Sequence, residues 1–180
     1  MAARRVDPHK LDVAALAAEG GRLEGEIDAS TLERWREMQS APADGPLPPV
    51  RWSVRGEQRQ RSGAPPQLWL HLQVAADAWP VCQRCLQPFC TPIEVARAFR
   101  FGATEGEAEA LDADSEDDVL AASASFDLVG LIEEELLLAW PLVPRHAQCS
   151  QPEHGAGDDP AAEDNPFAAL AAWKSSATKP

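Results

Sequence analysis

The sequence lacks the features of a membrane protein or of a secreted, disulfide-linked protein. No apolar run approaches the roughly 20 residues that cross a bilayer. The first eight residues contain no apolar segment typical of a secretory signal. Four cysteines in 180 residues are too few for a disulfide scaffold. Since 44% of the residues are apolar, enough for a core, we expect a reduced, cytoplasmic protein with no membrane contact.

The motifs of common catalytic sites are also missing. We find no G-x-x-x-x-G-K-[ST], no G-x-G-x-x-G after a strand, no G-x-S-x-G and no H-E-x-x-H. The four histidines form no close pair in the sequence. The sequence therefore indicates a protein that is not an enzyme. The enzymatic alternative is a zinc-dependent RNA-processing nuclease, which would need a bound metal and a base such as Glu135.

Positive charge is scarce in the second half of the chain. Residues 1–100 hold 13 of the 16 Lys and Arg and 12 of the 29 Asp and Glu, a net charge of +1. Residues 101–180 carry a net charge of −14. Such a chain cannot bind nucleic acid with its whole surface, but a face in the first half still could. The acidic half would instead suit a basic protein partner.

Periodicity predicts an α+β fold, in which one long amphipathic helix packs on a small, mostly antiparallel, barrel-like sheet. Alternating apolar residues predict strands over 22–27, 50–54, 68–76 and 93–101. A short helix is expected over 11–18 and another over 32–39. The long helix spans Leu128–Trp140, with Asp127 as its N-cap and Pro141 at its end.

The remaining segments are polar or charged, and we expect little regular structure in most of them. Residues 102–124 should form a flexible acidic loop, since 102–118 contain eight Asp or Glu and no Lys or Arg. The domain would then cover 1–149, followed by a disordered linker over 150–164. A short C-terminal docking helix is expected over 165–174, with Asn165 as N-cap, Pro166 at the first helical position and Phe167 as an apolar anchor.

Two cysteines with metal-ligand spacing lie between two predicted strands, at the expected tip of a hairpin. Cys82 and Cys85 form a C-x-x-C pair, and His146 with Cys149 forms a looser H-x-x-C pair. Together these four residues predict a zinc site, with Cys90 as a further candidate ligand. The alternative is a pair of thiols that pack the hairpin tip without a metal. A redox pair is disfavoured because the flanks are strand-like, with no helix N-terminus at the first cysteine.

Glu135 lies on the apolar stripe of the long helix. On a helical wheel it falls inside the arc of about 160° that holds Leu131, Ile132, Leu136, Leu138 and Ala139, while Glu133 and Glu134 point away. A buried carboxylate is costly unless it is paired. We therefore expect a partner, either Arg84, Arg145, a backbone N–H or a metal. The alternative is a glutamate that reaches water at a groove.

Basic side chains alternate with the apolar positions of the strands, on the side that also carries Trp69. A sheet face with arginines and an aromatic ring is a plausible RNA platform. The alternative is an ordinary solvated sheet face. The RNA-binding candidates, which also include the arginine between the two cysteines, are Arg51, Arg55, His71, Arg84, Arg97 and Arg100.

Three segments in this order resemble those of one known family. They are Cys82-Gln-Arg-Cys-Leu-Gln-Pro-Phe89, Glu133-Glu-Glu-Leu-Leu-Leu-Ala-Trp-Pro-Leu-Val-Pro-Arg-His146 followed by Cys149, and Asn165-Pro-Phe-Ala-Ala-Leu-Ala-Ala-Trp-Lys174. The sequence is similar here to the YceD family, the large ribosomal RNA subunit accumulation proteins. The family motif residues are Cys82, Arg84, Cys85, Glu135, Pro141, His146, Asn165, Pro166 and Phe167.

The resemblance implies a biological role more than a mechanism. Members of the family are linked to the synthesis, processing or stability of 23S ribosomal RNA, and no catalytic activity is attached to them. The expected partner is therefore 23S ribosomal RNA or its precursor, or a basic protein of the large subunit. The alternatives are the zinc-dependent enzyme above and an acidic chaperone for a basic ribosomal protein. We expect no cofactor, and bound zinc is the one alternative that the sequence leaves open.

Overall fold

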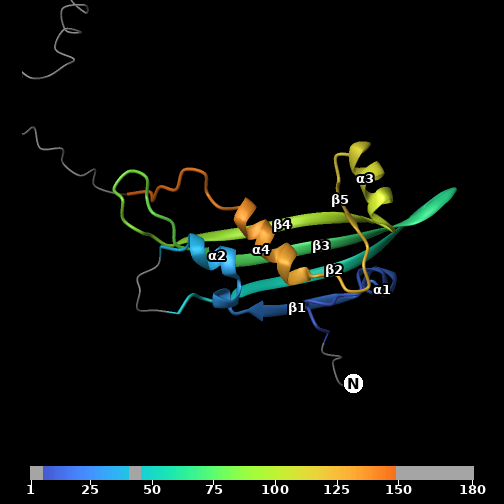
Figure 1. Ribbon diagram of the computed structural model, residues 1–180, viewed down its shortest axis with the longest axis horizontal. Helices are drawn as coiled ribbons and strands as arrows, with labels where there is room; N and C mark the ends of the chain where they lie inside the picture. Colours follow the sequence, from blue (N-terminus) through green and yellow to red (C-terminus); the bar gives the residue numbers. More distant parts are fainter. Residues whose placement is uncertain (1–5, 41–45, 149–180) are drawn as a thin grey trace, which may run out of the picture. The chain divides into compact units, whose positions relative to one another are not determined.

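A five-stranded sheet forms the centre of the computed structural model, which describes residues 6–40 and 46–148 (Figure 1). The strands follow each other in the sheet in chain order, antiparallel from β1 to β4 and parallel between β4 and β5. Because β1 and β5 lie at opposite ends of this order, the sheet is open and not a closed barrel. The strands are β1 (Arg22–Ile27), β2 (Val50–Arg61), β3 (Ala64–Ala78), β4 (Thr91–Gly102) and β5 (Asp118–Ala121).

Helices cover one face of this sheet, and Figure 1 shows α2 and α4 lying across the strands. They are α1 (Val13–Glu19), α2 (Glu33–Met38), which follows the short 3-10 helix η1 (Ala29–Thr31), and α4 (Leu128–Leu138). We call this side of the sheet the covered face. The predicted cap of α4 is confirmed, since the Asp127 carboxylate accepts hydrogen bonds from the Val129 and Gly130 N–H groups at 3.1 Å.

The core lies between α4 and the covered face. Leu128, Ile132 and Leu136 are fully buried, as the helical stripe predicts. Alternate residues of β3, among them Leu70 and Leu72, point toward this helix and are equally buried. The stripe ends one turn before the sequence predicts, because Leu138 is 74% exposed.

The polar segment between the second and third predicted strands, where little regular structure was expected, belongs to the sheet. Here β2 and β3 continue as a long hairpin, which reverses at Gly63 with a φ of +76°. Glycine adopts this left-handed conformation without steric cost. The prediction failed because this end of the hairpin carries polar residues on successive positions, which removes the alternation that marks a half-buried strand.

The acidic segment 102–124 is also not the predicted loop. It forms α3 (Glu105–Ala113) and β5. Thr104 caps α3 by accepting a hydrogen bond from the Glu107 N–H, and the Glu107 carboxylate accepts one from the Ala103 N–H at 3.0 Å. This arrangement is a capping box whose carboxylate bond is displaced by one residue, to the residue before the N-cap, and the acidic first turn is further favoured by the helix dipole. The acidic residues therefore stabilise a helix here.

All of these elements belong to a unit that spans Met1–His146, and the second unit of the chain is Ala147–Pro180. The predicted linker over 150–164, the predicted helix over 165–174 with Asn165, Pro166 and Phe167, and the candidate ligand Cys149 lie outside the described residues. Among the residues that are described, no helix is long and apolar enough to span a membrane.

Candidate functional site

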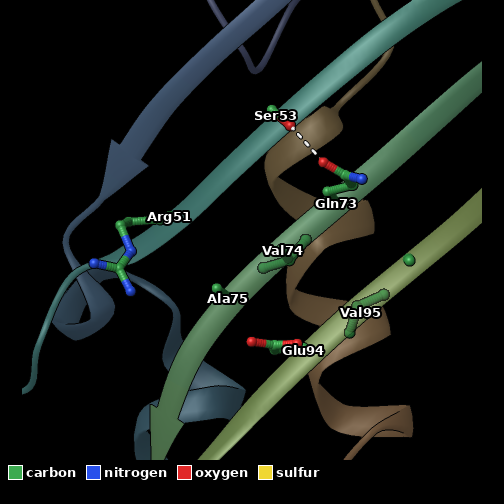
Figure 2. Close-up of a pocket in the computed structure, with 8 residues that line it drawn as sticks. Arg51, Ser53, Gln73, Val74, Ala75, Glu94 and Val95 are labelled. Atoms are coloured by element: carbon green, nitrogen blue, oxygen red, sulfur yellow. Dashed lines mark hydrogen bonds between the residues drawn. The ribbon is translucent and has the colours of Figure 1, made fainter.

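The side of the sheet opposite α4 carries small, polar and charged side chains, and we call it the open face. In Figure 2 this face is turned to the viewer, with a helix behind the strands. Its centre is a shallow hollow of about 540 Å³, where Ser53 and Gln73 point toward each other and hydrogen bond at 3.4 Å. The hollow is lined by Arg51, Ser53, Gln73, Val74, Ala75, Glu94, Val95 and Ala96.

The formal charges of the open face cancel. By strand register and alternation, the side chains of β1 to β4 that the structure describes include five arginines and five acidic residues on this side, together with His71. RNA-binding faces carry a clear excess of positive charge. The predicted basic platform is therefore a balanced surface. The charged residues are Arg22, Arg51, Arg55, Arg59, Arg100, Glu24, Glu26, Glu57, Asp77 and Glu94.

Several basic side chains of this face are paired with the Glu57 carboxylate. The Glu57 carboxylate accepts from Arg59 at 2.9 Å, lies 2.6 Å from the His71 Nε2 and contacts Arg55 at 3.4 Å. The hydrogen bonds from Arg59 and His71 lower the pKa of Glu57 to about 2. Arg59 also stacks over the ring of Trp69, 4.1 Å from its centroid, and this ring is only 6% exposed. The aromatic residue that the RNA hypothesis needs is thus covered.

The six predicted RNA-binding residues do not share one surface. Arg51, Arg55, His71 and Arg100 lie on the open face. Arg84 lies between β3 and β4, at the tip that holds the cysteines. Arg97 does not lie on the open face, because its register partner is Leu72 and it therefore belongs to the covered face. Its Nη2 donates to Asp118 Oδ2 at 2.7 Å, and its Nε lies 3.7 Å from Glu135 Oε2.

Glu135 is buried, with 7% exposure, as the helical wheel indicates. Its partner is Arg97, and neither Arg84 nor Arg145 takes this place. Burial raises the pKa of Glu135; Arg97 opposes this effect, and the nearby charges of Asp118 and Glu134 add to it. Arg97 thus links α4, β4 and β5, since its two partners lie on the other two elements. This arrangement supports a structural role for Glu135.

Glu133 also has a role that the sequence did not reveal. The helical wheel places it in solvent, yet its side chain is only 13% exposed. Its carboxylate accepts from the Trp35 N–H at 3.2 Å and from Arg34 Nε at 3.1 Å. It therefore caps α2, whose own N-cap residue, Leu32, has no side-chain oxygen. No sequence signal indicates this contact, because only the structure shows that α2 begins directly after Leu32.

A second candidate surface is the acidic lobe, which we define as residues 105–118, from the start of α3 to the first residue of β5. It holds eight acidic residues and no basic one. Glu107 and Asp112 bond to backbone N–H groups, and Asp118 pairs with Arg97. The lobe is fixed to the sheet at Gly102, where an added Cβ would lie 2.6 Å from the Ala108 nitrogen. Five further acidic residues of the lobe are exposed, and their carboxylates make no hydrogen bond or ion pair in the described structure. They are Glu105, Glu109, Asp114, Glu116 and Asp117.

The third candidate is a cluster of Cys82, Cys85 and His146. Their possible ligand atoms all lie within 4.8 Å of one another, and the Cys85 Sγ is 3.7 Å from the His146 Nε2. Cys82 is fully buried. Burial alone would raise the pKa of the Cys82 thiol, but hydrogen bonds from the backbone N–H groups of Cys85, Arg84 and His146 outweigh this effect and lower it. The structure thus brings together three of the four predicted zinc ligands, while the fourth, Cys149, lies outside the described residues.

The backbone around Cys82 forms a tight, closed turn. Leu86 N–H donates to the Cys82 carbonyl at 2.9 Å, and Cys82 N–H donates to the Gln87 carbonyl at 2.9 Å. Leu86 has a φ of +60°, which is unusual for a residue with a branched side chain. The segment after α4 joins this turn, because Gln83 N–H donates to the Pro144 carbonyl at 2.9 Å. This hydrogen bond brings His146 close to the cysteines.

Comparisons with known proteins agree with the motifs in the sequence. A family model described as "Large ribosomal RNA subunit accumulation protein YceD" matches residues 70–174. A protein of Haemophilus influenzae with the same description is 34% identical over 100 residues, which is 52% of this chain and 58% of the relative. The chain thus aligns with little more than half of that relative's length. No solved structure matches the chain.

Proposed function

Because this chain belongs to the YceD family, named for the accumulation of large-subunit ribosomal RNA, we propose that it is a non-enzymatic factor of ribosome biogenesis. It supports the synthesis, processing or stability of 23S ribosomal RNA. It does so by binding a basic protein of the large subunit through the acidic lobe. This function belongs to the cytoplasm, and a content of only four cysteines in 180 residues supports that location.

The arrangement of titratable groups supports binding over catalysis. In the ranges 6–40 and 46–148, one group of at least three potential metal donors comes together, and it consists of Cys82, Cys85 and His146. Glu135, the base that a zinc nuclease would need, lies outside this group and contacts Arg97. A base held by an arginine and removed from the metal donors is a poor proton acceptor for a metal-bound water.

The observation that carries the proposal is the ordered acidic lobe. Five exposed carboxylates without a bond in the described structure project from one folded segment that has no basic residue. Charge of a single sign on a fixed scaffold attracts an oppositely charged partner and orients it before contact. The same charge repels RNA phosphates. A basic ribosomal protein is therefore the partner that this surface fits.

A second candidate is direct binding of precursor 23S RNA to the open face. The observation in its favour is the shallow hollow beside Arg51, whose guanidinium is drawn clear of Glu94 in Figure 2. Against it stand the balanced charges of this face and the covered ring of Trp69. RNA binding would depend steeply on salt and would weaken when Arg51 and Arg55 are replaced.

The test compares the acidic lobe with the rest of the surface. The full chain is titrated with each purified basic protein of the large subunit and with a precursor 23S transcript, at several salt concentrations. We expect one basic protein to bind the native chain. Neutralising the lobe should weaken that binding by at least about tenfold. The lobe variant carries Glu105→Gln, Glu109→Gln, Asp114→Asn, Glu116→Gln and Asp117→Asn.

A control variant with the same change in net charge makes the result specific. It neutralises five exposed acidic residues on other elements, through Glu19→Gln, Glu24→Gln, Glu26→Gln, Glu37→Gln and Glu94→Gln. This variant should keep native affinity. Equal losses in both variants would contradict a role for the lobe. Binding of the transcript alone, lost in Arg51→Gln/Arg55→Gln, would replace the proposal with the RNA candidate.

A further inference from the structure

The hairpin tip and the segment after α4 meet at a set of groups with the chemistry of a metal site. Cys82 and Cys85 come from the turn between β3 and β4, and His146 comes from a segment about 60 residues later in the chain. Two sulfurs and one imidazole are typical donors for zinc, whereas magnesium and calcium are bound by oxygen atoms. We propose that Cys82, Cys85 and His146 bind one zinc ion, which fastens the end of the folded unit to the hairpin tip.

The distances suit this ion. Zinc–sulfur bonds of about 2.3 Å and zinc–nitrogen bonds of about 2.0–2.1 Å, set at tetrahedral angles, place a sulfur and a nitrogen about 3.6 Å apart. The Cys85 Sγ and His146 Nε2 are 3.7 Å apart. All possible donor atoms of the group lie within 4.8 Å of one another. Small rotations of the side chains are therefore enough to bring the three donors around one ion.

The backbone of the tip is arranged as in a metal-binding turn. Backbone N–H groups of Arg84, Cys85 and His146 hydrogen bond to the Cys82 sulfur, so both chain segments of the cluster hold this sulfur in place. Leu86, directly after the second cysteine, takes a left-handed conformation that leucine adopts only at a cost. This conformation lets the Leu86 N–H reach back to the Cys82 carbonyl and closes the turn. The strained residue thus lies where the cysteine pair must be held in shape.

The imidazole of His146 packs against a neighbouring ring, but one of its nitrogens has no hydrogen-bond partner among the described residues. The ring of Phe89 lies edge-on to it, with centroids 5.1 Å apart. The buried Nδ1 of His146 has no hydrogen-bond partner among the described residues. The 3.7 Å distance to the Cys85 sulfur assigns the zinc to Nε2. The Nδ1 therefore keeps the proton of the neutral imidazole, which leaves the Nε2 lone pair free for the metal.

The role of this zinc ion is structural. Cys82 is fully buried, and the three donors join the hairpin tip to segment 144–146, beside the hydrogen bond from Gln83 to Pro144. Metal binding at such a site contributes directly to folding stability. The ion would fix the exposed segment around Leu142 and Val143, whose side chains are 99% and 59% exposed, beside the hairpin tip.

The experiment measures metal content in the full chain. Protein purified under reducing conditions is loaded with zinc, dialysed and analysed for bound metal, and the same protein is titrated with Co²⁺. We expect one zinc per chain and a cobalt spectrum with thiolate charge-transfer bands. Removing zinc with a chelator should lower Tm by roughly 5–15 °C. The variants Cys85→Ser and His146→Ala should bind zinc at least about tenfold more weakly.

The control is Cys90→Ser, which removes an exposed cysteine outside the cluster. It should bind zinc as the native chain does. Since Cys82→Ser would disturb a buried position, the proposal is judged on the native chain and on Cys85→Ser, whose folding is checked by circular dichroism. The proposal is overturned if native protein holds no more zinc than Cys85→Ser. It is equally overturned if Cys82 and Cys85 are found as a disulfide in protein that carries no metal.

Discussion

The two faces of the sheet differ in burial, although neighbouring residues of the same strands form both of them. On β3, Leu72 is 1% exposed beneath α4, whereas the next residue, Gln73, lies in the hollow of the open face. On β2, Val54 is buried and Arg55 is exposed. The covered face therefore provides most of the stability. The exposed side chains of the open face and of the acidic lobe that make no bond can vary at little cost to the fold, which is the condition for a surface that binds a partner.

The largest effect should come from a change on the covered face. Leu72→Ala removes a fully buried side chain, so we expect a loss of about 2–5 kcal/mol in the free energy of unfolding. The neighbouring change Gln73→Ala should stay within about 0.5 kcal/mol. Urea unfolding of both variants measures this difference. Losses of similar size at the two positions would show that the two faces do not differ in the way described.

The second-largest loss of stability should come from a change at Gly102, where the acidic lobe packs against the sheet. A Cβ at Gly102 would lie 2.6 Å from the Ala108 nitrogen, so Gly102→Ala must push α3 away from β4. We expect a loss of about 1–3 kcal/mol and faster hydrogen exchange in α3. Gly106→Ala is the matched control, since an added Cβ there meets nothing within 4 Å. It should be neutral or stabilise α3 by up to about 1 kcal/mol, because alanine favours helices.

Two glutamates on opposite faces should respond to pH in opposite directions. Burial raises the pKa of Glu135 above the ordinary value of 4.5. In the folded state this carboxyl therefore holds its proton more tightly than in the unfolded chain. Its contribution to stability is present below pH 4.5 and declines as pH rises through the raised pKa. Glu135→Gln should remove this decline, as measured by unfolding free energy against pH.

On the open face, Glu57 should behave in the reverse way. Its pKa is lowered from 4.5 to about 2 by Arg59 and His71, so its ionised form stabilises the folded state above pH 4.5. That stabilisation is lost as pH falls from 4.5 toward 2. The variant Glu57→Gln should lose less stability than the native chain over this interval. A native-like acid profile for this variant would mean that the Arg59 and His71 contacts do not favour the charged form.

Where the sequence alternates clearly, it predicted the fold well. The leucine stripe and Asp127 located α4, and alternating apolar residues located the strands. The prediction failed over 102–124, where a high content of Asp and Glu was interpreted as a loop. The capping box formed by Thr104 and Glu107 stabilises the helix in that segment, and the pairing of β5 depends on β4, which local sequence does not reveal.

The candidate site was predictable where it rests on short motifs. The C-x-x-C spacing and His146 pointed to a cluster that the structure brings together. Arg97 was misplaced because its apolar register was overlooked, and its partners Asp118 and Glu135 lie on distant elements. The covered ring of Trp69 and the balance of charge on the open face depend on pairing between strands. No local pattern shows such pairing.

Crosslinking in growing cells tests most directly whether the acidic lobe binds the partner. The full chain is crosslinked in place and purified, and the attached peptides and RNA fragments are identified together with their positions on the chain. We expect peptides of a basic large-subunit protein joined to the segment 105–118. Crosslinks of precursor 23S RNA to the strands around Arg51 and Arg55, with none to the lobe, would contradict this result.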